Sequence, residues 1–248
     1  MERLVQIASN SMRIHAENQR LIAAGLANQN TIAFKRDYGN ASSAYFEGEG
    51  ATDRVFPTRG ENAVDLEVGK IIPTENPLDV SIEGPGFFAA QKSNGDDVLT
   101  RRGDFKIGAD RILRNGEGVA ILGDGGPITI PPYESIEISR DGSVLIRAPG
   151  TAADAAATPV GRLRMVNVPA SNVERGIDAL LRTRDRIIPQ ADANITLNPK
   201  GLEASNISPI DAMVDMLGSS RSFELSVKLL TTAKELDDQT ARLMRTDR

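Results

Sequence analysis

The sequence contains no cysteine and only one histidine, His15, among its 248 residues. Without cysteine there can be no disulfide, no thiol nucleophile and no thiolate ligand, and this absence fits an oxidising or a reducing compartment equally well. A lone histidine cannot build a common transition-metal site. We therefore interpret His15 as a hydrogen-bonded residue at a helix interface, and we expect no metal and no cofactor.

Aromatic residues are also scarce: they make up 4% of the chain, and tryptophan is absent, although 40% of the residues are hydrophobic. Aromatic side chains bury the largest areas, so we predict an aliphatic core. The carboxylate pairs Asp79 with Glu83 and Asp104 with Asp110 could serve as acid and base in glycoside cleavage. A chain this acidic contains many such pairs by chance, and there is no Gly-x-Ser-x-Gly nucleophile motif. We expect a protein that is not an enzyme.

Concentrated positive charge is missing too, since 29 basic residues face 34 acidic ones and the net charge is −5. Nucleic-acid binding depends on clustered Lys and Arg, so no nucleic-acid partner is expected. No stretch approaches the roughly 20 apolar residues needed to span a membrane. Residues 1–10 lack a basic segment followed by an apolar run, so we expect no cleavable Sec-type signal. If the protein leaves the cell, it uses another route.

Residues 208–248 predict one long helix with apolar residues on two faces. Ser208 can cap the helix, Pro209 fits its first position, and Asp211 stands where a capping-box acid would. Apolar residues advance by three and four positions along each face. The first face comprises Met213, Met216, Leu217, Phe223, Val227 and Leu230, and the second Leu225, Leu229, Ala233, Leu236 and Leu243. A helix with two apolar faces needs neighbours on two sides.

Residues 3–28 give a second helical pattern, which ends near Asn28 and Thr31. Its apolar residues also spread over more than one face. We predict that both helices contact neighbouring subunits. The candidate interface residues are Leu4, Ile7, Ile22, Leu26, Met213, Met216, Leu217, Phe223, Val227, Leu230 and Leu236.

The middle of the chain changes its pattern. Residues 37–76 are expected to form an extended connector with one or two short strands, one of them at 63–68. Residues 77–206 contain many short apolar runs separated by Gly, Asn and Asp turns, which predicts an antiparallel β sandwich or barrel. The predicted fold class is therefore α+β.

Three arginines alternate at positions 182, 184 and 186 within a predicted strand over residues 180–188. A strand would place all three side chains on one face. They could meet an acidic partner, or they could simply form a solvated strand face.

Four ordered motifs make the chain resemble the flagellar rod and hook family over essentially its whole length. They lie at residues 26–36, at 78–88 with 100–105, at 201–207, and at 221–224 with Lys228. The motif residues we single out are Leu26, Ala27, Asn28, Thr31, Phe34, Lys35, Gly84, Gly86, Phe87, Phe88, Leu202, Glu203, Ser205 and Asn206. Ala33 departs from the motif, since the family usually has Gly there, and the turn could therefore differ in its backbone dihedrals.

The resemblance implies that the two terminal helices pack as a coiled-coil-like pair and against those of neighbouring subunits, forming an inner tube around an export channel. It implies a terminal assembly domain of residues 1–36 with 207–248, the connector 37–76, and a β-rich outer domain 77–206. The expected function is that of a structural rod subunit that transmits torque. The expected partners are other flagellar rod subunits and the flagellar type III export apparatus, and the expected location is the periplasmic rod of the basal body.

Within the family, the chain length and the segments 159–163 and 174–176 favour a proximal-rod member. The alternatives are a distal-rod or hook subunit, or a periplasmic carbohydrate-binding or carbohydrate-acting domain with oligomerising helices. A deep pocket with converging polar groups in residues 77–206 would favour the carbohydrate alternative.

Overall fold

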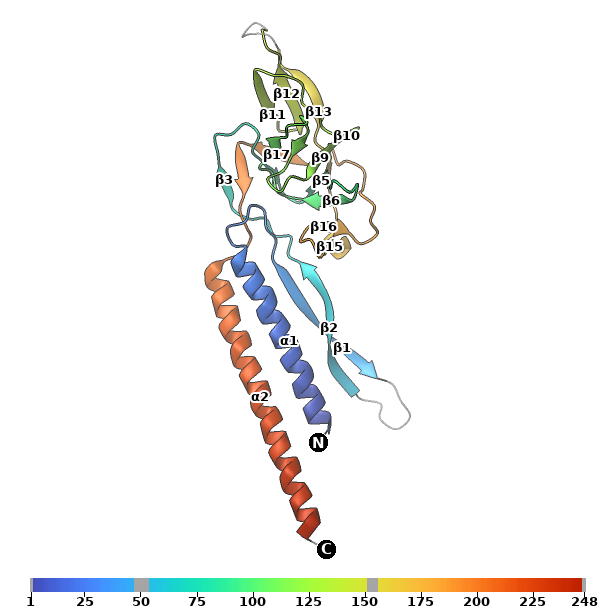
Figure 1. Ribbon diagram of the computed structural model, residues 1–248, viewed down its shortest axis with the longest axis vertical. Coiled ribbons are helices and arrows are strands. Elements are labelled where there is room, and N and C mark those ends of the chain that lie inside the picture. The colour runs from blue at the N-terminus through green and yellow to red at the C-terminus, as the bar shows by residue number, and fades with distance from the viewer. Residues whose placement is uncertain (1, 47–53, 151–155, 247–248) are drawn as a thin grey trace. The chain divides into compact units, whose positions relative to one another are not determined.

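A computed structural model describes residues 2–46, 54–150 and 156–246, and it describes the side chains of 5–39, 63–150, 156–236 and 238–240. The chain is α+β, with two helices and mostly antiparallel strands, as the sequence predicted (Figure 1). It divides into two compact units. The helical unit comprises Met1–Ala27, Asp37–Ala63 and Ser208–Arg248, and the β unit comprises Asn28–Arg36 and Val64–Ile207.

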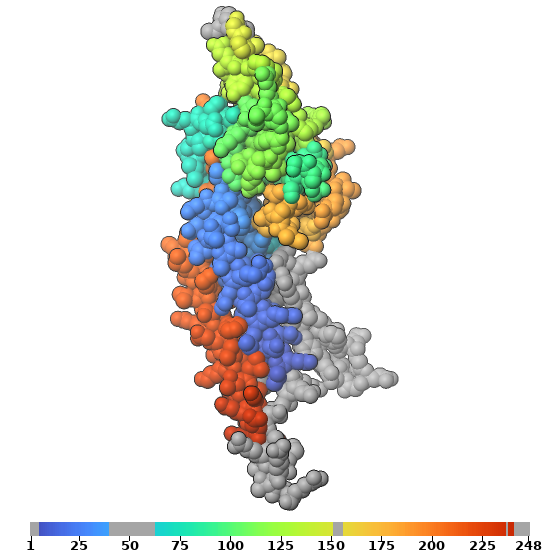
Figure 2. Space-filling model, in the orientation of Figure 1, coloured from blue at the N-terminus to red at the C-terminus, as the bar shows by residue number. Residues whose placement is uncertain are grey.

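The helical unit contains α1 (Glu2–Ala27) and α2 (Pro209–Thr246), which lie side by side (Figures 1 and 2). The predicted start of α2 is confirmed, because the backbone N–H of Asp211 donates to the Ser208 hydroxyl oxygen at 3.4 Å. The strands β1 (Asp37–Phe46) and β2 (Arg54–Val64) pair with each other, and β1 contacts α1.

The strands between residues 37 and 76 are longer than the sequence suggested. β1 and β2 contain 10 and 11 residues, whereas only short strands were expected. The strand expected at 63–68 was wrong, since β2 ends at Val64 and the next strand, β3, begins at Ile71. Strand formation depends on pairing and packing more than on local propensity, so residues with no clear alternation can still form a ribbon against a helix.

The strands of the β unit are short, and most belong to a sheet with the order β15-β16-β6-β5-β9-β8-β7, in which β10 also pairs with β9 and β14 with β5. The remaining strands form the sheets β11-β12-β13, β17-β4 and β18-β3. The bounds are β3 Ile71–Pro73, β4 Val80–Glu83, β5 Phe87–Gln91, β6 Asp97–Thr100, β7 Lys106–Ile107, β8 Leu113–Arg114, β9 Ala120–Gly123, β10 Gly126–Pro127, β11 Ser135–Ile138, β12 Ser143–Arg147, β13 Thr158–Arg162, β14 Met165–Val166, β15 Val173–Arg175, β16 Leu181–Thr183, β17 Thr196–Pro199 and β18 Gly201–Glu203, with one 3₁₀ turn at Ala170–Asn172. β15 and β7 stand at the two ends of the largest sheet, so the strands described form no closed barrel.

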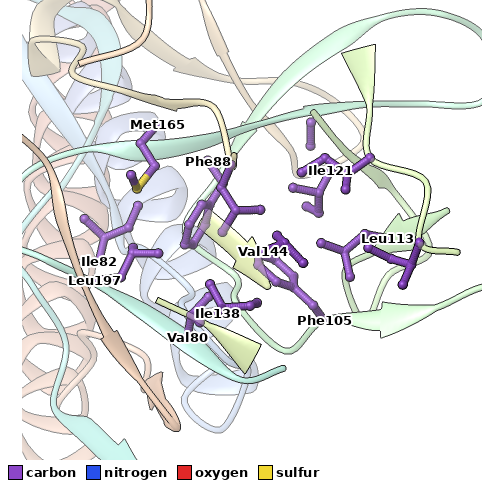
Figure 3. Close-up of a cluster of buried hydrophobic side chains, with 14 of the residues drawn as sticks. Val80, Ile82, Phe88, Phe105, Leu113, Ile121, Ile138, Val144, Met165 and Leu197 are labelled. Carbon is purple, nitrogen blue, oxygen red and sulfur yellow. The ribbon is translucent and has the colours of Figure 1, made fainter. Parts of the chain in front are cut away.

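The core of the β unit is aliphatic with a few phenylalanines, as the composition predicted. Side chains from β4, β5, β9, β11, β12, β14 and β17 converge in it (Figure 3). Phe88 and Phe105 meet edge to face with their ring centroids 5.2 Å apart. In this geometry the positive edge of one ring is attracted to the negative face of the other. The labelled core residues are Val80, Ile82, Phe88, Phe105, Leu113, Ile121, Ile138, Val144, Met165 and Leu197.

The predicted strand over residues 180–188 is confirmed only in its first part, because β16 runs from Leu181 to Thr183 and the chain turns after it. Arg182 is buried, and both of its terminal nitrogens donate to the Asp178 carboxylate at 2.6 Å. These hydrogen bonds, together with one from Lys92, hold the pKa of Asp178 well below its ordinary value. Arg186 lies in a turn with a φ of 59°. The three arginines therefore do not form one strand face.

Candidate assembly surface and motif junction

Large apolar side chains are exposed along the helical unit. Of the eleven predicted interface residues, five are exposed and five are half-buried, while the side chain of Leu4 lies outside the described residues. The exposed residues are Ile7, Met213, Leu217, Val227 and Leu236, and the half-buried ones are Ile22, Leu26, Met216, Phe223 and Leu230. Leu217 is 61% exposed. Whether these residues contact another subunit stays a prediction.

The structure adds exposed residues that our interface set lacked. Ile210 is 75% exposed and Val214 is 62% exposed, and Leu225 and Leu229 are exposed further along α2. At about 100° per residue, Ile210 and Val214 lie on the same side of the helix as Leu217, roughly opposite the buried Ala212. We call Ile210, Val214, Leu217, Leu225, Leu229 and Leu236 the outer row of α2.

The buried positions of α2 show which side of the helix is covered. Among its described side chains, those of Ala212, Ser226 and Ala233 are buried, and all three are small. On α1, Ala8 and Leu21 are buried. His15 is hydrogen-bonded to α2 through its backbone, since the Ser219 hydroxyl donates to the His15 carbonyl oxygen at 3.1 Å. The half-buried Met216, Phe223 and Leu230 lie on the same side of the helix as Ala212, and the outer row lies away from that side.

The β unit brings three of the sequence motifs together at a buried charge cluster. Glu203 accepts from the Lys35 ammonium at 2.6 Å and from Arg101 Nε at 2.7 Å. It also accepts from the Gly69 backbone N–H at 2.9 Å. None of the three charged residues is more than 3% exposed. We call Lys35, Arg101 and Glu203 the Glu203 cluster.

Arg101 is held by the glycine turn of the central motif. Its Nη1 donates to the carbonyl oxygens of Gly84 and Gly86 at 3.0 and 2.7 Å, and its Nη2 donates to that of Ile82 at 3.2 Å. Gly84 and Gly86 have φ angles of 82° and 142°, which only glycine adopts without strain. The turn therefore needs both glycines to aim its carbonyl groups at Arg101.

The Glu203 cluster contains two cations and one carboxylate. Burial lowers the pKa of the Lys35 ammonium below its ordinary value, although the charge and hydrogen bond of Glu203 act in the opposite direction. Lys35 also donates to the Glu67 carbonyl oxygen. Buried ions are costly unless they are paired and hydrogen-bonded. Glu203 is the carboxylate that compensates both cations.

The side chain of Asn206 joins three segments of the β unit. Its side-chain oxygen accepts from the Arg36 N–H at 2.8 Å, and its side-chain nitrogen donates to the Asp65 carbonyl oxygen at 3.1 Å. The Asp65 N–H in turn donates to the Arg36 carbonyl oxygen at 2.8 Å. Arg36, Asp65 and Asn206 lie within two residues of the boundaries 36/37, 63/64 and 207/208.

Other motif residues support the same region. Arg175 lies over the ring of Phe34, 4.9 Å from its centroid, and donates to the Lys35 carbonyl oxygen at 2.6 Å. The Ser205 hydroxyl accepts from the Ile207 N–H at 3.3 Å, and Thr31 donates to the Asn28 side chain at 3.2 Å. Phe87 and Phe88 are buried in the core, Leu202 is half-buried, and Leu26 and Ala27 close α1.

Ala33 adopts a left-handed backbone with a φ of 53°, and its N–H donates to the Glu203 carbonyl oxygen at 2.8 Å. Glycine adopts such a positive φ without strain, whereas the residue here is alanine. A left-handed backbone costs a residue with a Cβ roughly 1–2 kcal/mol. Glycine avoids this cost, but it also makes the unfolded chain more flexible, which offsets part of the stabilisation.

We expect Ala33→Gly to raise the unfolding free energy of the β unit by up to about 1 kcal/mol. Urea unfolding, followed by amide exchange of β5 and β6, would measure this change. Ala109→Gly is the matched control, since Ala109 is exposed and has an ordinary negative φ. A loss of stability in Ala33→Gly would contradict the strain account.

The carboxylates considered as catalytic acids have structural partners. Asp104 accepts from Arg102 Nε at 2.7 Å, and Asp110 accepts from Arg114 at 2.6 Å. Asp79 is buried and accepts from the Asn76 side chain at 2.7 Å. Among the residues described, no three His, Asp or Glu side chains are grouped to hold a metal ion. In the described part of the chain, neither helix is apolar enough over a sufficient length to cross a bilayer.

Comparison with known proteins gives two family matches and relatives of full length. Residues 81–146 match the family described as flagellar hook protein FlgE/F/G D1 domain, and residues 200–243 match flagellar basal body rod FlgEFG protein C-terminal. The chain is 30% identical to the flagellar basal-body rod protein FlgF of Escherichia coli, over 98% of this chain and 97% of that protein. The chain belongs to the flagellar basal-body rod protein family.

Two further relatives also belong to the rod proteins of the flagellar basal body. This rod protein is 29% identical to FlgF of Salmonella typhimurium over 98% of the chain and 99% of the relative. It is 27% identical to the basal-body rod protein FlgG of Agrobacterium fabrum over 94% and 96%. It is therefore a structural rod subunit of the flagellar basal body and not an enzyme, and it assembles with other basal-body components.

Proposed function

We propose that this rod protein is a proximal-rod subunit that assembles helically with other rod proteins, transmits torque and encloses the export channel. Its identity to three relatives named FlgF is 29–30%, compared with 26–27% to those named FlgG, while a fourth relative named FlgF is 25% identical. The resemblance in length and in the segments 159–163 and 174–176 supports the proximal assignment.

The observation that supports assembly through the helices is the outer row of α2. Burying one large aliphatic side chain stabilises a contact by roughly 1.5–3 kcal/mol, and a monomer leaves these residues in water. Contiguous exposed apolar surface on a protein commonly marks an interaction site. We propose that the outer row, together with Ile7, Met213 and Val227, packs against the helices of neighbouring subunits.

In this proposal α1 and α2 form a coiled-coil-like pair, and residues 1–36 with 207–248 act as the assembly domain. Residues 37–76 connect it to a sandwich-like β domain of residues 77–206, which forms the outer layer. Subunits that meet head to tail without closing a ring generate a helical filament, which is the symmetry of a rod. Delivery would use the flagellar type III export apparatus without a cleavable signal, and the rod would lie in the periplasm.

Cysteine cross-linking tests the proposal directly, because the native chain has no cysteine. We expect Leu217→Cys and Leu229→Cys to cross-link to neighbouring rod subunits in isolated basal bodies, and mass spectrometry of the products would name those subunits. Asp124→Cys, at an exposed turn of the β unit, is the matched control. An absence of products from both α2 positions in assembled basal bodies would refute the outer row as an interface.

A further inference from the structure

The contacts around Glu203 fall into two groups, which differ in how far apart the joined residues lie in the sequence. The carbonyl groups that hold Arg101 come from residues only 15–19 positions away, and the pairing of β5 with β6 joins them to it. Short-range contacts of this kind close small loops, so they cost little entropy and form early. Arg101 can therefore be in place before either end of the chain arrives.

Glu203 comes from much farther along the chain. It lies 102 residues from Arg101, 134 from Gly69 and 168 from Lys35. Contacts at such separations close large loops and tend to form late in folding. Until the Glu203 carboxylate arrives, the Arg101 and Lys35 cations have no buried counter-charge, and closing the region around them is unfavourable.

We propose that Glu203 closes the β unit last: its carboxylate docks onto the Arg101 site already formed by the 84–86 turn, and it fixes Lys35 there at the same step. Docking also joins the segments 33–36 and 203–206. The Ala33 N–H donates to the Glu203 carbonyl oxygen at 2.8 Å, and the Asn206 N–H donates to that of Phe34 at 3.2 Å. Both segments are thereby held against each other within the β unit.

Residue 203 is also made late, since a chain is synthesised from its N-terminus. The β unit therefore stays open while most of the chain is being made. The folding order itself is a property of the isolated chain. A failure of the cross-linking test above would therefore leave it standing, and a failure of the folding test would leave the assembly interface standing.

Pulsed amide exchange during refolding of the full-length wild-type chain tests the order. The amides of Ala33, Gly69, Ala204 and Asn206 all report on the closed state, because their hydrogen bonds join the segments around Glu203. We expect them to gain protection in a later kinetic phase than the amides of β5 and β6. Protection of both groups in the same phase, or of the Glu203 region first, would overturn the proposal.

The variant Glu203→Gln provides a second readout. Removing one partner of a buried ion pair is strongly destabilising, and an interaction absent from the transition state affects the unfolding rate rather than the folding rate. We expect the unfolding rate of the β unit to increase on the order of 100-fold and its refolding rate to change by less than about twofold. Refolding that slows in proportion to the lost stability would place Glu203 in the folding nucleus and overturn the proposal.

Two further variants complete the test. Glu83→Gln removes an exposed carboxylate of the same unit and is expected to change neither rate by more than about twofold. Glu203→Asp keeps the charge on a shorter side chain and is used if Glu203→Gln does not fold. We expect it to speed up unfolding less than Glu203→Gln does, and again to leave the refolding rate nearly unchanged.

Discussion

Leu217→Asp is expected to abolish incorporation into the rod, and with it motility, while the purified chain stays folded. Leu217 is 61% exposed, so the isolated chain loses little packing when it is replaced. In an assembled rod the same carboxylate would be buried among apolar side chains without a partner. Loss of a central apolar contact typically costs 2 kcal/mol or more, which is about 30-fold or more in affinity. Val227→Asp is expected to act in the same direction.

Swimming assays and the subunit content of isolated basal bodies measure this effect, and circular dichroism of the purified variants checks their folding. Thr231→Asp introduces the same charge at an exposed polar position of α2 and serves as the control. Leu217→Met keeps the apolar character and should assemble. Normal motility of both Leu217→Asp and Val227→Asp would show that this side of α2 is not an interface.

Arg101→Met is expected to lower the unfolding free energy of the β unit by about 3–5 kcal/mol. The change leaves three backbone carbonyl groups without their donor and removes one of the two cations that face Glu203. Lys35→Met should cost less, about 1–2 kcal/mol, because it removes the surplus cation and leaves Arg101 paired with Glu203. Urea unfolding, read from amide exchange in β5 and β6, separates the two variants.

Arg140→Met is the matched control, since Arg140 is exposed and the substitution keeps its backbone carbonyl, which accepts from the Leu197 N–H. It should change stability by less than about 0.5 kcal/mol. A larger loss in Lys35→Met than in Arg101→Met would contradict the account of two cations sharing one carboxylate.

Local chemistry allowed part of this fold to be predicted. The capping residue Ser208 with Pro209 marked the start of α2, and the alternation around Val80 and Ile82 marked a strand of the core. Both signals act over a few residues. The turn glycines 84 and 86 were also recognisable as a motif. Their structural role could not be predicted, because Arg101 reaches their carbonyl groups only in the folded chain.

Features that depend on distant partners were missed. The strand expected through Arg184 and Arg186 ends at Thr183, because the chain turns there: the Arg186 N–H donates to the Thr183 carbonyl oxygen and the Ile187 N–H donates to the Asp185 carboxylate. The outer row of α2 was underestimated at Ile210 and Val214, because periodicity shows that apolar faces exist and does not show which one a neighbour covers. The buried small residues Ala212, Ser226 and Ala233 were the available signal. Nothing in the sequence pattern related Lys35 to Glu203 across 168 positions.

The hydrogen bonds of Asn206 have a consequence for the β unit itself. Its side chain joins Arg36 and Asp65, which lie 170 and 141 residues away along the chain, and the Asp65 N–H donates to the Arg36 carbonyl oxygen. Losing this one amide would therefore loosen three segments of the β unit at the same time, although they are far apart in the sequence.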